Sequence, residues 1–296
     1  MHIAIDRLIQ AIKEKGNPTV LGLDTRIEHI PQGMAAPAAT HKDAASAIYD
    51  YNVALVDALC DLVPAVKVQI AYYEMLGFWG LEAFAKTLSY AKSRGLIAMA
   101  DAKRNDIGAT AEAYAAAYLT CDAPFDADFL TVNPYLGSDG ILPFVNAARQ
   151  SGKGLFVLAK TSNPSSGEFQ DIDIDGNTLY EKVGDKIALW GQEAMGELGY
   201  SSVGAVVGAT YPEEGVKLRA RLPQVFFLVP GYGAQGATGK DLKGCFDKEG
   251  SGAIVNASRS LLMAHKKHAH LSFKEATRLE ATTMREDIMG AIRGES

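Results

Sequence analysis

The stretch "IAMADAKRNDIGAT", Ile97 to Thr110, decides how the chain folds, because it joins two kinds of sequence. It opens as an apolar run typical of a buried strand and turns helix-like from Ile107 onward. A strand that leads into an amphipathic helix predicts that the next strand pairs in parallel, after a helical crossover. At the junction stand four charged residues: Asp101, Lys103, Arg104 and Asp106.

The same kind of apolar run occurs eight times, each time followed by a longer amphipathic segment. The runs are "TVLGLDT", "AVKVQIAY", "LIAMADAK", "DFLTVNPY", "GLFVLAKTS", "GAVVGAT", "VFFLVPGY" and "AIVNASRS". Continuous apolar strands fit a parallel sheet that is covered on both faces. Eight such units predict an α/β fold, a (β/α)8 TIM barrel, with one domain over residues 1–296 and its active site at the C-terminal ends of the strands. A doubly wound open sheet is the alternative.

Composition limits the function. The chain has 296 residues, is 48% hydrophobic and carries a net charge of -6, which argues against a nucleic-acid or anionic-membrane surface. No apolar run reaches the about 18 residues that a transmembrane helix needs. The N-terminus has helical spacing and no signal-peptide core, so we expect a cytoplasmic protein.

Cysteines and histidines do not indicate a metal site. Cys60, Cys121 and Cys245 are far apart and share no CxxC spacing, which favours reduced, structural thiols. The "HKKHAH" run, residues 265–270, lies past the last predicted strand and is interpreted as a solvated helix face. We therefore expect no metal.

Two connections are long for loops, residues 162–177 and 231–252, and residues 272–296 predict one more surface helix. Long connections in a compact domain are usually functional or disordered. In a barrel, both would rise from the face that carries the active site.

Nearly every predicted strand ends in polar residues, and the C-terminal ends of barrel strands converge on one pocket. These residues are Asp24, Arg26, Lys67, Asp101, Lys103, Asn133, Tyr135, Lys160, Ser162 and Arg259. Asp101 and Lys103 are two apart on a strand, so their side chains leave the same face. With Lys67 on the neighbouring strand, they predict an alternating row of charges, suited to stabilising a carbanion and delivering a proton.

Asp106 and Thr110 are four residues apart at the start of a helix-like segment, so they lie on one face of its first turns. On spacing alone, this pair predicts helix capping by Asp106.

A phosphate site is predicted near the end of the chain. "PGYGAQGATG", residues 230–239, is glycine-rich, and glycine lets backbone amides approach an anion. Arg259 follows the eighth predicted strand, and the loops after strands seven and eight often bind phosphate in barrels. A guanidinium offers a phosphate a rigid fork of donors.

Taken together, the motifs resemble those of the orotidine 5′-phosphate decarboxylase family, in its longer bacterial branch. "DAKRNDIGAT" is similar to the family's D-x-K-x-x-D-[I/V]-x-x-T signature. The other family-like segments follow in the family's order: "LGLDTR", "AVKVQIAYYE", "TVNPYLGSDG", "AKTSNPSSGEFQ", "PGYGAQGA" and "NASRS". The resemblance covers most of the chain, from about Thr19 to Leu262.

The resemblance implies decarboxylation of orotidine monophosphate (OMP) to uridine monophosphate (UMP) through a C6 carbanion, without metal or cofactor. It implies that Lys103 is the proton donor and that Asp101 lies near the substrate's carboxylate, while Asp24 and Lys67 hold the ribose. Ser162 resembles the serine that recognises the pyrimidine edge, and Gln235 and Arg259 resemble the residues that bind the phosphate. Asp106 and Thr110 resemble residues that reach into a partner's site, which implies a homodimer with shared active sites. Asn133 receives no role.

Two alternatives remain open at this point. A magnesium-dependent sugar-phosphate decarboxylase or lyase would use the same barrel, but it would need metal-binding carboxylates and no pyrimidine loop around Ser162. A phosphate-binding barrel without catalysis would not need Asp101 and Lys103 side by side in a pocket.

Overall fold

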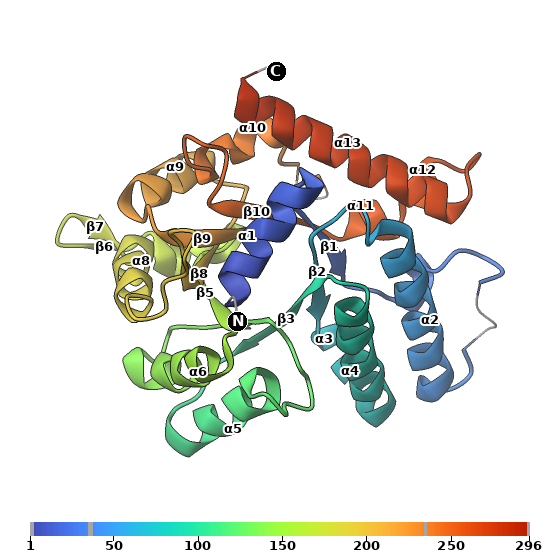
Figure 1. Cartoon of the computed structure of the whole chain (residues 1–296), viewed down its shortest axis with the longest axis horizontal. Helices are drawn as coiled ribbons and strands as arrows, with labels where there is room; N and C mark the ends of the chain where they lie inside the picture. The colour runs from blue at the N-terminus through green and yellow to red at the C-terminus, as the bar shows by residue number, and fades with distance from the viewer. Residues whose placement is uncertain (1–2, 35–37, 234–235, 295–296) are drawn as a thin grey trace.

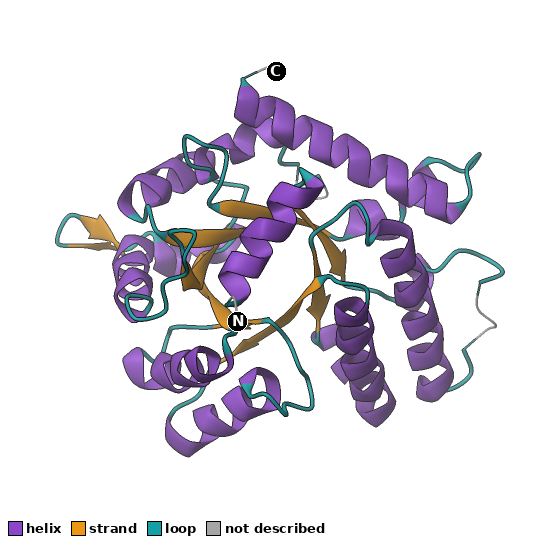
Figure 2. Cartoon of the chain, viewed as in Figure 1, coloured by secondary structure: helices purple, strands orange, loops and turns teal. Residues whose placement is uncertain are grey.

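The computed structural model describes residues 3–34, 38–233 and 236–294, and a closed barrel of eight parallel strands forms its centre (Figures 1 and 2). The order around the barrel is β1-β10-β9-β8-β5-β4-β3-β2. The strands are β1 (Thr19–Leu23), β2 (Ala65–Gln69), β3 (Ile97–Arg104), β4 (Phe129–Val132), β5 (Gly154–Lys160), β8 (Ser201–Val207), β9 (Val225–Pro230) and β10 (Ala253–Ala257). All eight apolar runs form barrel strands, so the TIM-barrel prediction is confirmed and the open sheet is wrong.

Helices surround the barrel, and one of them, α1, lies across its end (Figure 1). The longer ones are α1 (Ala4–Lys15), α2 (His41–Leu59), α4 (Gly77–Ser93), α5 (Gly108–Leu119), α6 (Ser138–Ser151), α8 (Leu179–Trp190), α9 (Pro212–Arg221) and α13 (Phe273–Arg293). The short ones are α3 (Ala71–Glu74), α7 (Gly167–Gln170), α10 (Gly239–Leu242), α11 (Arg259–Leu262) and α12 (Ala264–Lys267). None of the described helices has the length and apolar character needed to cross a membrane.

The two faces of each strand bury different residues. On β3, Ile97 and Met99 pack inside the barrel, whereas Ala98 and Ala100 pack against the outer helices. Because side chains alternate along a strand, Asp101 continues the inward row of β3. The strand thus changes from an apolar to a charged inner face as it approaches its C-terminal end.

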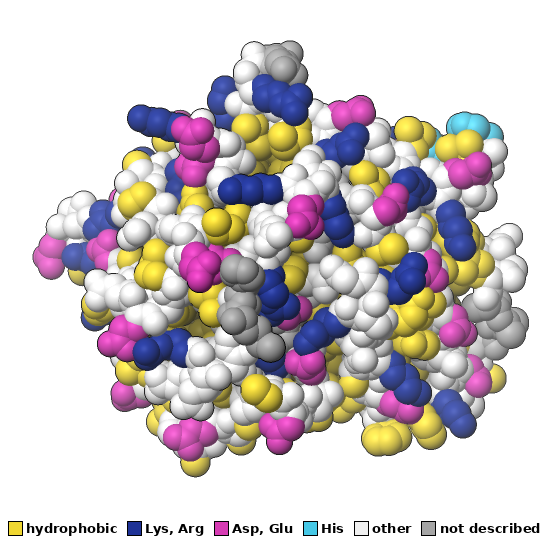
Figure 3. All heavy atoms as spheres, viewed as in Figure 1, with side chains coloured by type: hydrophobic (Ala, Val, Ile, Leu, Met, Phe, Trp, Pro, Cys, Tyr) yellow, Lys and Arg dark blue, Asp and Glu magenta, His cyan; other side chains and the backbone are white. Residues whose placement is uncertain are grey.

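One end of the barrel is closed by α1. Its apolar residues Ile5, Leu8 and Ile9 are buried against the inner residues of the strands. The side chain of Asp6 accepts hydrogen bonds from the backbone N–H groups of Glu197 and Leu198, which fixes the helix in place. Figure 3 views this closed face, where cationic and anionic side chains are interspersed. The charged interior therefore opens at the opposite end.

Both long connections contain secondary structure of their own. The connection after β5 holds a 3₁₀ turn (Pro164–Ser166), α7 and the small hairpin β6 (Asp173–Ile174) and β7 (Asn177–Thr178). The connection after β9 holds α10 and a 3₁₀ turn (Lys243–Cys245). The C-terminal helix predicted from residues 272–296 is confirmed as α13.

Candidate active site

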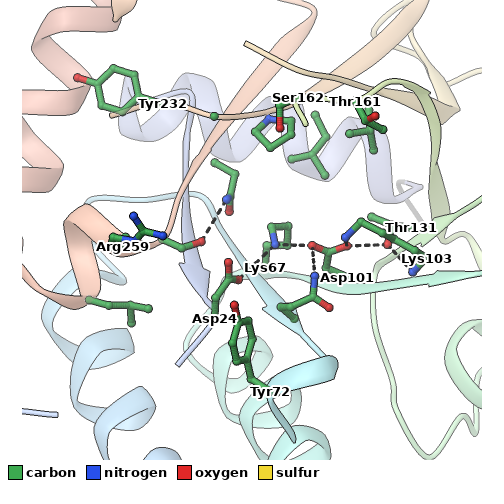
Figure 4. A pocket seen from close by; sticks show the side chains of 18 of the residues that line it. Asp24, Lys67, Tyr72, Asp101, Lys103, Thr131, Thr161, Ser162, Tyr232 and Arg259 are labelled. Atoms are coloured by element: carbon green, nitrogen blue, oxygen red, sulfur yellow. Dashed lines mark hydrogen bonds and ion pairs between the residues drawn. The ribbon is translucent and has the colours of Figure 1, made fainter. Parts of the chain in front are cut away.

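The C-terminal ends of the strands surround a cavity of about 790 Å³ (Figure 4). Its walls include six of the nine predicted site residues: Asp24, Lys67, Asp101, Lys103, Ser162 and Arg259. They come from β2, β3 and the segments that follow β1, β5 and β10, so residues far apart in the sequence meet in one place. Gln235 lies outside the described residues.

Four of these residues form an alternating row of charges (Figure 4). The ammonium of Lys67 lies 2.6 Å from Oδ2 of Asp101 and 3.5 Å from Oδ1 of Asp24. The ammonium of Lys103 lies 2.6 Å from Oδ1 of Asp101. The row therefore runs Asp24, Lys67, Asp101, Lys103, and each carboxylate borders at least one ammonium.

Burial strengthens the electrostatic interactions between the charges of this row. The side chains of Lys67 and Asp101 are 5% and 8% exposed, whereas Lys103 is 46% exposed towards the cavity. Burial alone would raise the pKa of Asp101, but Lys67 and Lys103 outweigh it and hold that pKa well below its usual range. Burial would lower the pKa of Lys67, but Asp101 and Asp24 raise it instead. Both buried groups therefore stay ionised at neutral pH.

Two uncharged residues that the sequence analysis missed complete the surroundings of Asp101. Gln69 donates from Nε2 to Oδ2 of Asp101 at 2.9 Å. The hydroxyl of Thr131 donates to Oδ1 at 2.9 Å. Gln69 stands two residues after Lys67 on β2, so strand alternation would have placed it on the same inner face. Thr131 lies inside an apolar run, where a threonine is usually read only as a strand former.

The wall of the cavity that faces away from the charges is partly apolar. Leu158 of β5, Val206 of β8 and Leu228 and Pro230 of β9 line it. A site with one charged side and one apolar side can hold a planar ring while it keeps water away from the charges, which strengthens their electrostatic effect.

Ser162 reaches the cavity from the loop after β5, which packs closely over Gly208, the residue that follows β8. A side chain at Gly208 would come within 2.8 Å of the backbone nitrogen of Ser162, so only glycine fits beneath this loop. The Ser162 carbonyl also accepts a hydrogen bond from Thr210 at 3.1 Å.

The expectation that Lys160 joins the pocket is wrong. Its side chain is fully buried outside the cavity, paired with Asp171, and its ammonium lies 4.7 Å from the ring centroid of Tyr211. The register between β5 and β8 shifts between Leu158 and Lys160, which interrupts the alternation that would have turned Lys160 inward. Lys160 instead attaches the loop that carries Ser162.

Arg259 lies at the start of α11 and lines the cavity, with its side chain exposed. It makes no ion pair with any residue in the described part of the chain, so its guanidinium is free to bind an anion. Tyr232, from the loop after β9, lines the same side (Figure 4). Its hydroxyl donates to Asp287 at 2.9 Å, so α13 holds the base of this loop.

Asp106 and Thr110 do not line the cavity of their own chain. The prediction that Asp106 caps a helix is wrong, because α5 begins later, at Gly108, and its N-cap Ile107 makes no side-chain capping bond. The side chain of Asp106 accepts a hydrogen bond from the N–H of Ile107, and Thr110 is exposed. Asn133 also lies outside the cavity, where its side chain accepts the N–H of Tyr135 in a local turn.

A comparison with known proteins shows which family has this barrel and these residues. The profile of the orotidine 5′-phosphate decarboxylase / HUMPS family matches residues 19–272. The chain belongs to the orotidine 5′-phosphate decarboxylase family.

Full-length relatives agree with this assignment. Orotidine 5′-phosphate decarboxylase of Clostridium kluyveri is 43% identical over 288 residues, which cover 96% of this chain and 97% of the relative. That of Clostridium acetobutylicum is 45% identical over 287 residues, 96% of this chain and 98% of the relative. A solved Streptomyces avermitilis structure assigned the same activity has a TM-score of 0.83 at 33% identity and covers 99% of this chain and 97% of its own.

The activity follows from the family. The protein decarboxylates orotidine 5′-phosphate, a carboxy-lyase reaction that yields UMP and carbon dioxide in pyrimidine biosynthesis.

Proposed function

We propose that the charge row performs this decarboxylation, with Lys103 as the proton donor. The observation that carries the proposal is a continuous row of ion pairs at the barrel mouth. Asp24 pairs with Lys67, Lys67 with Asp101, and Asp101 with Lys103. Fixed charges of this kind stabilise a charge that develops in the transition state without needing to reorganise.

In the proposed step, the bond between C6 of the pyrimidine and its carboxylate breaks heterolytically. The electron pair stays on C6 and carbon dioxide leaves. The ammonium of Lys103 stabilises the C6 carbanion and then gives it one proton, which forms UMP. Lys103 recovers a proton from water, and its exposure towards the cavity allows this exchange.

Asp101 contributes in two ways. Its negative charge keeps Lys67 and Lys103 in place, and its lowered pKa keeps it ionised beside the substrate's own carboxylate. Two neighbouring carboxylates repel each other, and the loss of carbon dioxide relieves that repulsion. The repulsion favours the reaction only if binding energy from the rest of the nucleotide holds the substrate in place.

The other cavity residues supply that binding energy. Asp24, 29% exposed, and Lys67 offer an acceptor and a donor to the ribose hydroxyls. Ser162 faces the cavity from the loop after β5, where it reads the pyrimidine edge. Arg259 binds the phosphate together with Gln235, which lies outside the described residues. Phosphate contacts far from C6 orient the reacting carbon.

A homodimer with shared sites accounts for Asp106 and Thr110. Both stand outside their own cavity, in a region rich in exposed apolar side chains that follow β2, β3 and β4: Met75, Phe78, Ile107, Tyr135 and Leu136. Phe78 is 72% exposed and Tyr135 is 80% exposed. Exposed large apolar residues gathered in one region mark an interaction surface. A second copy packed there in two-fold symmetry would receive Asp106 beside its own charge row.

The test of the proposed chemistry is the loss of OMP absorbance with purified protein, with and without EDTA. The charge row acts without a metal, so turnover to UMP should be unchanged by the chelator. A loss of activity in EDTA that magnesium restores would favour the metal-dependent sugar-phosphate enzymes of the same barrel.

The test of shared sites is mixing two inactive variants, Lys103→Ala and Asp106→Ala. In a mixed dimer, one site combines an intact Lys103 with an intact Asp106, so random exchange restores about a quarter of the wild-type activity. The control is a mixture of Lys103→Ala with Asp101→Ala, which share a site in one chain and restore nothing. No recovery despite demonstrated subunit exchange would contradict the shared site.

A further inference from the structure

The backbone of Lys103 has a conformation that its side chain disfavours. Its φ is +47°, in the left-handed region where a non-glycine residue pays a steric cost. Among the described non-glycine residues, Asp175 alone shares a positive φ, and it lies in the tight turn between β6 and β7. Lys103 has no such turn to explain it, because it lies near the end of a barrel strand. Strained conformations of this kind persist only where the surroundings hold them.

The ladder between β3 and β4 is interrupted at the same place. Met99 pairs with Phe129 and Ala100 with Leu130, but the next pair is Arg104 with Val132. Three residues of β3, 101–103, therefore stand opposite one residue of β4, Thr131. A bulge of this kind changes the direction in which side chains point. It also leaves backbone N–H and C=O groups without hydrogen bonds to the neighbouring strand.

The hydroxyl of Thr131 replaces the missing ladder bonds. It accepts the backbone N–H of Ala102 at 3.0 Å and that of Lys103 at 2.9 Å. It donates its own proton to Oδ1 of Asp101 at 2.9 Å. A hydroxyl has one donor and two acceptor positions, so Thr131, which is 2% exposed, uses its whole hydrogen-bonding capacity here.

The same atoms hold both ends of Lys103. The backbone N–H of Lys103 is bound to the Thr131 hydroxyl, and its ammonium is bound 2.6 Å from the Asp101 oxygen that this hydroxyl also contacts. We infer that Thr131 is a positioning residue: its hydroxyl holds the bulge of β3 in the one conformation that aims the Lys103 ammonium at the reacting carbon. This inference rests on the roles proposed above for Asp101 and Lys103.

Removing the Thr131 hydroxyl should therefore slow the chemical step while it leaves substrate binding largely unchanged. Thr131→Val keeps the shape of the side chain but removes the hydroxyl, so the backbone N–H groups of Ala102 and Lys103 lose their acceptor and the strained backbone is released. A displacement of about 1 Å in a catalytic group lowers the rate about 100-fold. Substrate binding depends on other cavity residues and should change little.

The experiment compares Thr131→Val, Thr131→Ser and a control, Thr87→Val, which also loses a buried hydroxyl but on α4. We expect Thr131→Val to lower kcat about 100-fold while KM stays within about threefold. Thr131→Ser restores the hydroxyl and should stay within about fivefold of the wild-type kcat, as should Thr87→Val.

Several outcomes would overturn the inference. These are a Thr131→Val kcat within about threefold of wild type, or a Thr131→Ser enzyme that is folded but as slow as Thr131→Val. A crystal structure of Thr131→Val in which φ of Lys103 stays positive and its ammonium stays in place would also overturn it. Lys103→Ala is measured in parallel: if that variant keeps its activity, the proton-donor proposal fails, whatever Thr131 does.

Discussion

Replacing Asp101 by asparagine removes the carboxylate at the centre of the charge row while it leaves the side-chain shape unchanged. In the wild-type protein this carboxylate accepts from Lys67, Lys103, Gln69 and Thr131, and its side chain is 8% exposed. Among the described residues, the variant leaves the buried ammonium of Lys67 with one ionic partner, Asp24, at 3.5 Å.

The magnitude follows from distance and burial. At 2.6 Å and an effective dielectric near 20, each ion pair of Asp101 attracts by about 6 kcal/mol before desolvation opposes it. The pair with Lys103 is worth less, because that side chain is 46% exposed and solvent screens it. Removing one partner of a buried pair typically costs about 3–5 kcal/mol, and we expect the free energy of unfolding to fall by that amount at pH 7.

The effect depends on pH in a defined direction. The pKa of Asp101 is lower in the folded protein than in the unfolded chain, where it is about 3.9. Its stabilising contribution is therefore complete above about pH 5 and is lost as the pH falls through the lowered folded pKa. The difference in stability between wild type and Asp101→Asn should be constant between about pH 5 and 8 and should narrow below about pH 4.

The assay is urea unfolding of both proteins at about pH 7, 5 and 3, so that the lowest pH lies below the unfolded pKa of an aspartate. Asp61→Asn is a surface control, because Asp61 pairs with Arg278 at 2.7 Å but the side chains of Asp61 and Arg278 are 62% and 45% exposed. After solvent screening, its loss should cost about 1 kcal/mol or less. Two results would refute the view that burial makes the loss of an ion pair in this row strongly destabilising. One is an equal free energy of unfolding for Asp101→Asn and wild type at pH 7, and the other is an equal decrease in that free energy in the two variants.

Two further predictions concern the phosphate side and the thiols. Under the proposed phosphate role of Arg259, Arg259→Ala removes a charge-assisted contact with the substrate, so KM should rise about 100-fold in steady-state kinetics with a smaller change in kcat; an unchanged KM would reject that role. Burial raises the pKa of Cys245 to about 12, so a thiol reagent at pH 8 should label exposed Cys121 in the native protein and Cys245 only after denaturation. Rapid native labelling of Cys245, mapped by peptide mass, would contradict its burial.

The barrel could be predicted because its signal is local and repeated. Each apolar run, such as that of β3, is short enough for a strand and continuous enough to be buried on both faces. The position of α1 could not be predicted in this way. Its helical spacing is visible in the sequence, but only the folded barrel shows that Ile5 and Leu8 close its N-terminal end.

The charged part of the site could be predicted from strand alternation, since Asp101 and Lys103 share a face by spacing alone. The same rule failed where a register shift interrupts a strand, and Lys160 lies outside the cavity for that reason. Thr131 could not be found because its role depends on a bulge in the neighbouring strand, which no residue pattern within β4 reveals.

The proton-donor role of Lys103 is tested most directly by the kcat of Lys103→Ala with saturating OMP. The control is Lys86→Ala, which removes a lysine of similar exposure on α4. Proton donation alone contributes about 10²–10⁴-fold, so we expect kcat to fall by at least about 10³-fold while the protein stays folded and still binds UMP. A folded Lys103→Ala enzyme with a kcat near that of wild type would contradict the proposed mechanism.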